Sequence, residues 1–338
     1  MHPRDYYADL LKSHGLREDF FPLKESDLEH IRKELRSLGF SDKEVHKRLE
    51  TAYQVGRDRF QWIVNTILET LLSRLSDEQR HFIKSSCYFA QFPIGDFNAV
   101  AVKCAPKAYL ILINVGLMVF LDHLTTLIFR FISEMSNAAS SRNNIDPDLK
   151  NERRSTGRLI MAAIKDFLIY RQAFAPLYDT SSALFPGRAT LLQKMEEFIL
   201  CHEISHVLKG HLDSDKETKI SIANFADDKS AEIRAIATDW DQEFEADAGG
   251  ALLMLDLPGL VKKRGDEFKN DFEPTVNAPL AFLAIGELIE KTCNISSKTH
   301  PPCNLRTEKL WNMLTVIFPK PALHFGYSFR QVLRGFVT

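Results

Sequence analysis

The sequence lacks the features that mark several large classes of protein. It has no uninterrupted run of 18 apolar residues, so we expect no segment that spans a membrane. Its net charge is only −2, and no helix-turn-helix pattern with a clustered basic helix is present, so we expect no nucleic-acid partner. The sequence also contains no internal repeat, no heptad array and no phosphate-binding glycine loop. Its oligomeric state is left open.

Cysteine is scarce as well. The chain has five cysteines, an odd number, and no C-x-x-C pair. No secretory signal segment is recognisable at its start. These features predict reduced thiols and a cytoplasmic location.

The most apolar segment covers residues 108–132. Polar side chains interrupt it at Asn114, Asp122, His123 and Arg130. Charged groups are costly at bilayer depth. We therefore predict a strand, a turn and a core helix here.

The 338 residues are enough for a large core, in one domain or two. We predict a helical N-terminal region over residues 1–86, with capping boxes at Ser41–Glu44 and Ser76–Gln79. Residues 87–338 are predicted to form the second domain. Helices are expected near 116–136, 155–174, 189–212, 240–256, 277–292 and 303–317.

The strand signals lie within residues 87–114. Short apolar runs at Phe97–Cys104 and Tyr109–Ile113 predict a small antiparallel sheet. Residues 137–152 are predicted to be an exposed loop, and residues 213–239 either a lid over a cleft or a long surface insertion. The expected fold class is α+β, mainly α.

The strongest indication of a functional site is the motif H-E-x-x-H, formed by His202, Glu203 and His206. Residues four apart on a helix differ by only about 40° in direction, so both imidazoles can bind one ion. Glu203 lies beside them and can reach a water in the ion's open position. Apolar neighbours on both sides indicate a buried helix, in which such polar groups need a partner. The motif predicts a Zn²⁺ site and metal-assisted hydrolysis.

The third ligand has two candidates. His211 follows His206 by five residues, which turns it about 140° off the ligand face if the helix continues, so we expect it at the helix end near Gly210. Glu243 begins a second helix and can complete a His₂Glu set. Asp247, one turn later, can accept a hydrogen bond from the outer nitrogen of a ligand histidine. The alternative for this acidic run is a helix start that complements the helix dipole.

The chain resembles a known family at these residues. H-E-x-x-H followed by E-F-E-A-D is similar to the gluzincin metallopeptidases of the CAAX prenyl protease and heat-shock membrane protease type. A later segment, His300-Pro301-Pro302 with Arg306, resembles their H-P-P-x-x-x-R element. The resemblance implies a zincin-like core with an active-site helix pair, a catalytic His300 near the substrate carbonyl, and an Arg306 that holds the site together. Without it, His300 begins a rigid turn and Arg306 is a solvated helix residue.

The resemblance also implies a substrate-binding strand beside the metal. Leu110, Leu112 and Asn114 would form a sheet edge to which an extended peptide adds by main-chain hydrogen bonds. The alternative is an ordinary buried strand.

The expected function is therefore a zinc-dependent endopeptidase that acts on a protein or peptide substrate, with Glu203 as general base. The resemblance extends to bacterial peptidases of stress response or phage exclusion. The alternative is a non-catalytic zinc-binding regulator or sensor on a peptidase fold. Structural zinc sites are usually closed and rich in cysteine, unlike this motif.

Overall fold

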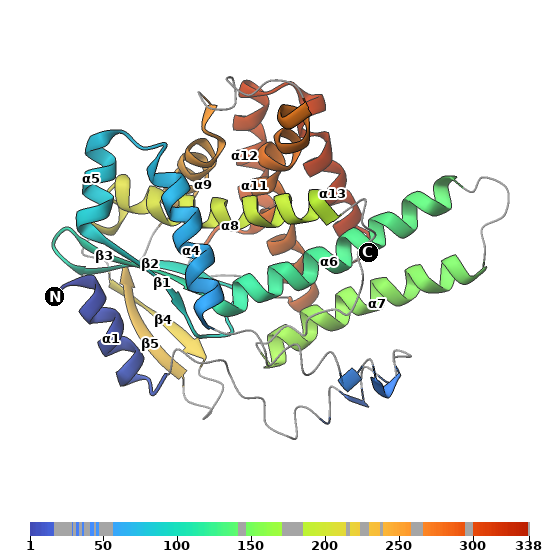
Figure 1. Cartoon of the computed structure of the whole chain (residues 1–338), viewed down its shortest axis with the longest axis horizontal. Helices are drawn as coiled ribbons and strands as arrows, with labels where there is room; N and C mark the ends of the chain where they lie inside the picture. Colours follow the sequence, from blue (N-terminus) through green and yellow to red (C-terminus); the bar gives the residue numbers. More distant parts are fainter. Residues whose placement is uncertain are drawn as a thin grey trace.

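The computed structural model describes residues 1–16, 57–140, 147–170, 185–213, 217–223, 230–236, 239–257, 266–294 and 300–336, with a few single residues between 29 and 46. Helices make up most of this part, beside a small sheet (Figure 1). The predicted class, α+β and mainly α, is confirmed at this level.

The sheet contains β1 (Cys87–Phe92), β2 (Ala99–Ala105) and β3 (Ala108–Asn114) in the order β1-β3-β2. β2 and β3 are antiparallel, whereas β1 runs parallel to β3. The prediction of an antiparallel sheet was wrong in this respect. The tight turn at residues 105–108 pairs β2 with one edge of β3, which leaves the other edge of β3 for β1.

The two faces of the sheet are covered by different helices. On one face, Leu110 and Leu112 pack with Tyr7 and Leu10 of α1 (Pro3–Ser13). On the other face, Ile111 belongs to the main core, which α4 (Arg57–Leu72) and α8 (Phe185–Leu208) also build. Side chains alternate between the faces of a strand, so β3 serves both cores.

Helix α8 crosses the middle of the molecule in Figure 1, and other helices of the described part lie on both sides of it in that view. They are α5 (Asp77–Ser86), α6 (Val115–Ser140), α7 (Pro147–Tyr170), α9 (Trp240–Leu255), α11 (Asp266–Cys293), α12 (Cys303–Ile317) and α13 (His324–Arg334), with 3₁₀ turns η1 (His211–Asp213) and η2 (Lys320–Leu323). α8 packs against α9, α11, α6 and α4. The motif helix is therefore central to the core.

Several predicted boundaries shift. The predicted loop over 137–152 is partly helix, because α6 runs to Ser140 and α7 begins at Pro147. α11 begins at Asp266, eleven residues before the predicted start, with Pro274 and Pro279 inside it. The capping box at Ser76 is confirmed, whereas the one at Ser41–Glu44 falls partly outside the described residues.

The segment 213–239 contains a hairpin. β4 (Glu217–Ala223) and β5 (Ser230–Ile236) are antiparallel, and β5 lies near β2. The residues between these two strands lie outside the described part. A role as a lid stays a prediction.

Helix α6 is long and apolar enough over Val115–Met135 to cross a membrane by length and composition. However, 72% of its most apolar stretch is buried inside the protein, which is typical of a core helix. The prediction that no segment spans a membrane stays a prediction.

The predicted N-terminal region shares the core of the rest of the chain. Phe60, Val64 and Leu71 of α4 are buried in the same cluster as residues of α8 and α11. The boundary at residue 86 stays a prediction.

Candidate metal centre

Helix α8 carries the motif inside the core. Its apolar residues point in every direction and are almost fully buried, including Phe198, Leu200, Cys201, Ile204 and Val207. Such a helix is stabilised by packing on all sides. His202, Glu203 and His206 are consequently buried as well.

Helix α9 brings the acidic side chains to α8. Asp239 caps its first turn in a reciprocal pair with Gln242, at 2.9 and 3.0 Å. Gly249 and Gly250 allow a close approach between the helices. A Cβ atom at Gly250 would lie 2.8 Å from the backbone nitrogen of His202, and one at Gly249 would lie 2.2 Å from Oγ of Ser205. The absence of side chains at these two positions is what lets Glu243 reach the histidines.

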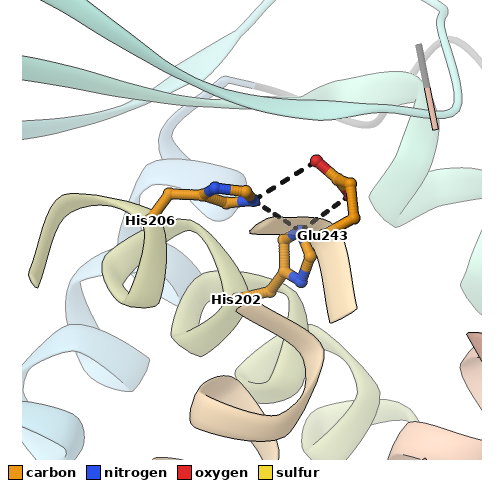
Figure 2. A group of neighbouring side chains, drawn as sticks. All are labelled: His202, His206 and Glu243. Atoms are coloured by element: carbon orange, nitrogen blue, oxygen red, sulfur yellow. Dashed lines mark hydrogen bonds and ion pairs between the residues drawn. The ribbon is translucent and has the colours of Figure 1, made fainter. Parts of the chain in front are cut away.

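The three predicted ligands converge. Figure 2 shows the Glu243 carboxylate facing both imidazoles, and one ligand atom from each residue lies within 4.8 Å of the others. His202 Nε2 and His206 Nε2 are 3.1 Å apart. The carboxylate oxygens of Glu243 lie 3.6 Å from His202 Nε2 and 3.5 Å from His206 Nε2.

These separations between ligand atoms fit a metal ion with tetrahedral coordination. With metal–ligand bonds of about 2.0–2.1 Å, two tetrahedral ligands lie about 3.3–3.5 Å apart. The distances in the group, 3.1, 3.5 and 3.6 Å, bracket this value. The buried His₂Glu group can therefore hold a divalent metal ion, and its nitrogen and oxygen donors suit zinc among others.

The protonation of the two histidines differs. Burial, together with the neighbouring imidazoles of His202 and His211, lowers the pKa of His206 to about 2, so its ring is neutral. Burial also lowers the pKa of His202, but the hydrogen bond and charge of Asp247 outweigh it and raise the pKa above the ordinary value. A ligand imidazole must be neutral at the nitrogen that binds the metal.

Asp247 lies behind His202, as predicted. Its Oδ1 is 3.0 Å from His202 Nδ1, the nitrogen that points away from the ligand group. Arg306 holds the same carboxylate by two hydrogen bonds, from Nε at 2.8 Å and from Nη2 at 2.6 Å. Burial alone would raise the pKa of Asp247, but the charge of Arg306 and the hydrogen bonds hold it well below its usual range. The carboxylate is therefore ionised and can fix the tautomer of His202.

Helix α12 positions Arg306 in its first turn. Glu290 of α11 accepts hydrogen bonds from the Cys303 backbone N–H at 3.0 and 3.2 Å, a cap supplied from outside the helix. Pro302 precedes the helix with an extended backbone. Arg306 is 9% exposed, so it is a buried partner of Asp247, and the interpretation as a solvated residue was wrong.

Glu203 lies between the metal group and strand β2. The backbone of Ala101 in β2 lies close enough to its carboxylate to lower the pKa of Glu203 slightly. Burial, reinforced by the charge of Glu243, raises the pKa of Glu203 to about 7. A carboxyl group that exchanges its proton near neutral pH suits a general acid–base role.

His300 reaches the same group from the segment before α12. Its Nε2 lies 3.7 Å from a carboxylate oxygen of Glu243, and its side chain is 36% exposed. Burial lowers the pKa of His300, so the ring is mainly neutral near pH 7. It thus borders the metal group on a side that solvent can reach.

The predicted substrate strand is placed differently. β3 is the central strand, paired on both edges, so Leu110, Leu112 and Asn114 cannot form a sheet edge. Leu110 and Leu112 also face α1, away from α8. The alternative of an ordinary buried strand is correct, and the strand beside Glu203 is β2, at an edge of the three-stranded sheet.

His211, the less favoured candidate for the third ligand, is a neighbour of the ligand group and not part of it. It lies behind His206, with the Nδ1 atoms of the two rings 3.0 Å apart. Its position depends on a chain reversal at Gly210, which has a positive φ of 71°. Gly210, four residues after His206, was the sequence signal for a helix end at this point.

Comparison of the chain with protein-family models, curated proteins and solved structures gave no match. Any function must therefore be argued from the geometry of the site itself.

Proposed function

We propose that this protein is a zinc-dependent endopeptidase of the gluzincin type that its motifs resemble. The observation that supports it most is the spacing of the buried ligand atoms of His202, His206 and Glu243, which matches one tetrahedral ion. A glutamate beside them on the motif helix provides the general base.

Each neighbouring residue has a distinct task in this proposal. A zinc ion held by the group would polarise the scissile carbonyl and lower the pKa of a water molecule. Glu203 accepts the proton of the attacking water and passes it to the leaving amine. His300, on the accessible side, donates a hydrogen bond to the developing oxyanion. Asp247 and Arg306 hold His202 in the tautomer that exposes Nε2.

The substrate in this proposal is a protein or peptide in extended form. Ala101, whose backbone lies near Glu203, belongs to β2, and β2 pairs with β3. An extended peptide can lie along this strand by main-chain hydrogen bonds, which places its carbonyl groups near Glu203.

The direct test is Glu203→Gln. The amide keeps the size of the side chain but cannot accept the proton, so we expect bound zinc to be retained and cleavage of a labelled, unfolded protein substrate to fall by about 10²–10⁴-fold. Glu308→Gln, an exposed position on α12, is the matched control and keeps full activity. New protein termini in cells that express the wild type, absent with Glu203→Gln, would identify substrates.

The same experiment separates the enzyme from a zinc-binding regulator. A regulator would bind zinc, give no new termini and show no cleavage that a hydroxamate inhibits. Cleavage by Glu203→Gln at the wild-type rate would remove the proposed base.

A further inference from the structure

The chain reverses directly after the motif helix and returns a histidine to the site. α8 ends at Leu208, and Gly210 adopts the left-handed conformation that a side chain rarely tolerates. The backbone N–H of Asp213 then donates to the Gly210 carbonyl at 3.0 Å and closes the turn η1. His211, the first residue of this turn, is 5% exposed and packs edge-on against the His206 ring.

His211 bridges His206 and a carboxylate of helix α9. Its Nδ1 lies 3.0 Å from His206 Nδ1, and its Nε2 lies 3.2 Å from Oε2 of Glu245. Glu245 is otherwise largely exposed and also lies 3.7 Å from Lys209 Nζ. Both ring nitrogens of the buried His211 are thus used, one toward the metal group and one toward solvent.

The hydrogen bonds between His206, His211 and Glu245 determine which ring nitrogens carry protons. His206 presents Nε2 to the ligand group, so its ring proton is on Nδ1. That N–H donates to Nδ1 of His211, which must then carry its own proton on Nε2 and donate it to Glu245. Each nitrogen has one role, and only this arrangement leaves His206 Nε2 available for a metal.

We propose that His211 is a positioning residue for the metal centre, which fixes the orientation and tautomer of His206 and is itself fixed by Glu245. The proposal deepens the zinc site on which the proposed function rests. It makes the two ligand histidines unequal: an ionised, arginine-held Asp247 supports His202, whereas a neutral imidazole supports His206. Removal of an outer partner of this kind weakens metal binding by about 10–100-fold.

The test measures Zn²⁺ affinity by competition with a chromogenic chelator, and needs no substrate. His211→Phe keeps a ring but has no hydrogen-bonding atom, and we expect its Kd for Zn²⁺ to rise by about 10–100-fold. His211→Gln retains an acceptor for His206 and a donor for Glu245, so its Kd is expected within about threefold of the wild type. Glu245→Gln, at an exposed position, gives a smaller loss than His211→Phe and covers the case in which the latter does not fold.

The absorption spectrum of the Co²⁺-loaded protein adds a readout that packing alone would not move. We expect the visible bands to change in His211→Phe and to be restored in His211→Gln. Wild-type Zn²⁺ affinity in His211→Phe would overturn the proposal, and so would equal losses in the Phe and Gln variants. Such results leave the endopeptidase standing if the wild type binds zinc and cleaves. Conversely, the proposed affinity pattern without any cleavage would overturn only the enzyme.

Discussion

Arg306 grips Asp247 in a two-point contact, with Nε 2.8 Å from Oδ2 and Nη2 2.6 Å from Oδ1. Both side chains are buried, and Asp247 in turn lies 3.0 Å from the outer nitrogen of His202. A planar guanidinium matches a carboxylate in this way, whereas a lysine cannot. The contact therefore connects helix α12 to a metal-binding histidine on α8.

Replacement of Arg306 by leucine should lower the free energy of unfolding, because it removes the contact with Asp247. Asp247 would lose the guanidinium that holds its buried carboxylate by two hydrogen bonds, and breaking a buried ion pair in this way costs about 3–5 kcal/mol. We expect urea unfolding in the presence of a chelator to show a loss of this size. The exposed Lys84→Leu on α5 is the control and should change the free energy of unfolding by less than about 0.5 kcal/mol. A similar stability for both variants would contradict a structural role for the pair.

Gly250→Ala should damage the metal centre without changing any ligand. The added Cβ would lie 2.8 Å from the backbone nitrogen of His202, so α9 must move away from α8. Overpacking of this kind costs about 1–3 kcal/mol. We expect lower stability and weaker Zn²⁺ binding, measured by thermal unfolding and chelator competition.

Gly187→Ala is the matched control for that substitution. Gly187 lies in α8, and a Cβ there meets nothing within 4 Å. Because alanine favours a helix by about 1 kcal/mol over glycine, this variant should be as stable as the wild type or more so. If both alanine variants behaved alike, close packing at Gly250 would not be needed.

Glu287 should make the protein sensitive to acid. Burial raises the pKa of Glu287, but Lys291, Arg330 and Arg334, at 2.7–3.0 Å, outweigh it, and the pKa lies below its ordinary value. A carboxyl group whose pKa is lower in the folded state stabilises the fold above its unfolded pKa, near 4.3, and this contribution is lost as the pH falls through the folded pKa.

The pH dependence of urea unfolding tests this contribution. Between about pH 5 and pH 3 the free energy of unfolding of Glu287→Gln should fall less steeply than that of the wild type, because the variant has no proton to gain at this position. Glu308→Gln, on the exposed side of α12, should follow the wild-type slope. Parallel slopes for Glu287→Gln and the wild type would rule out the depressed pKa.

Addition of zinc should stabilise the folded chain. A ligand that binds only the folded state adds about 2.7 kcal/mol when its free concentration is 100 times Kd. We expect this gain in the free energy of unfolding of the wild type. Glu243→Gln, which replaces a strong ligand by a weak one, should gain clearly less at the same zinc concentration.

The parts of the site that are local in sequence could be predicted. His202 with His206, and Glu243 with Asp247, are pairs four residues apart, and the helical repeat alone places each pair on one face. The contact between His211 and His206 could not be obtained in this way, because it depends on the end of α8 at Leu208 and the reversal at Gly210. A helix extended to residue 212 turns His211 away from the site.

The order of the strands in the sheet was the other feature that could not be predicted from the sequence. Period and composition identify β3 as a strand, but its neighbours depend on pairing between distant segments, so its central position and the parallel β1 were missed. α11 begins at Asp266, ahead of the predicted start at 277. The added part contains Pro274, a residue type that is normally disfavoured inside a helix.

The most direct measurement is a zinc-edge X-ray absorption and anomalous diffraction experiment on the zinc-loaded protein. We expect one zinc ion per chain, bound by Nε2 of His202, Nε2 of His206 and a carboxylate oxygen of Glu243 at about 2.0–2.2 Å. A protein that binds no zinc, or a zinc ion that Glu243 does not contact, would contradict the proposed metal centre.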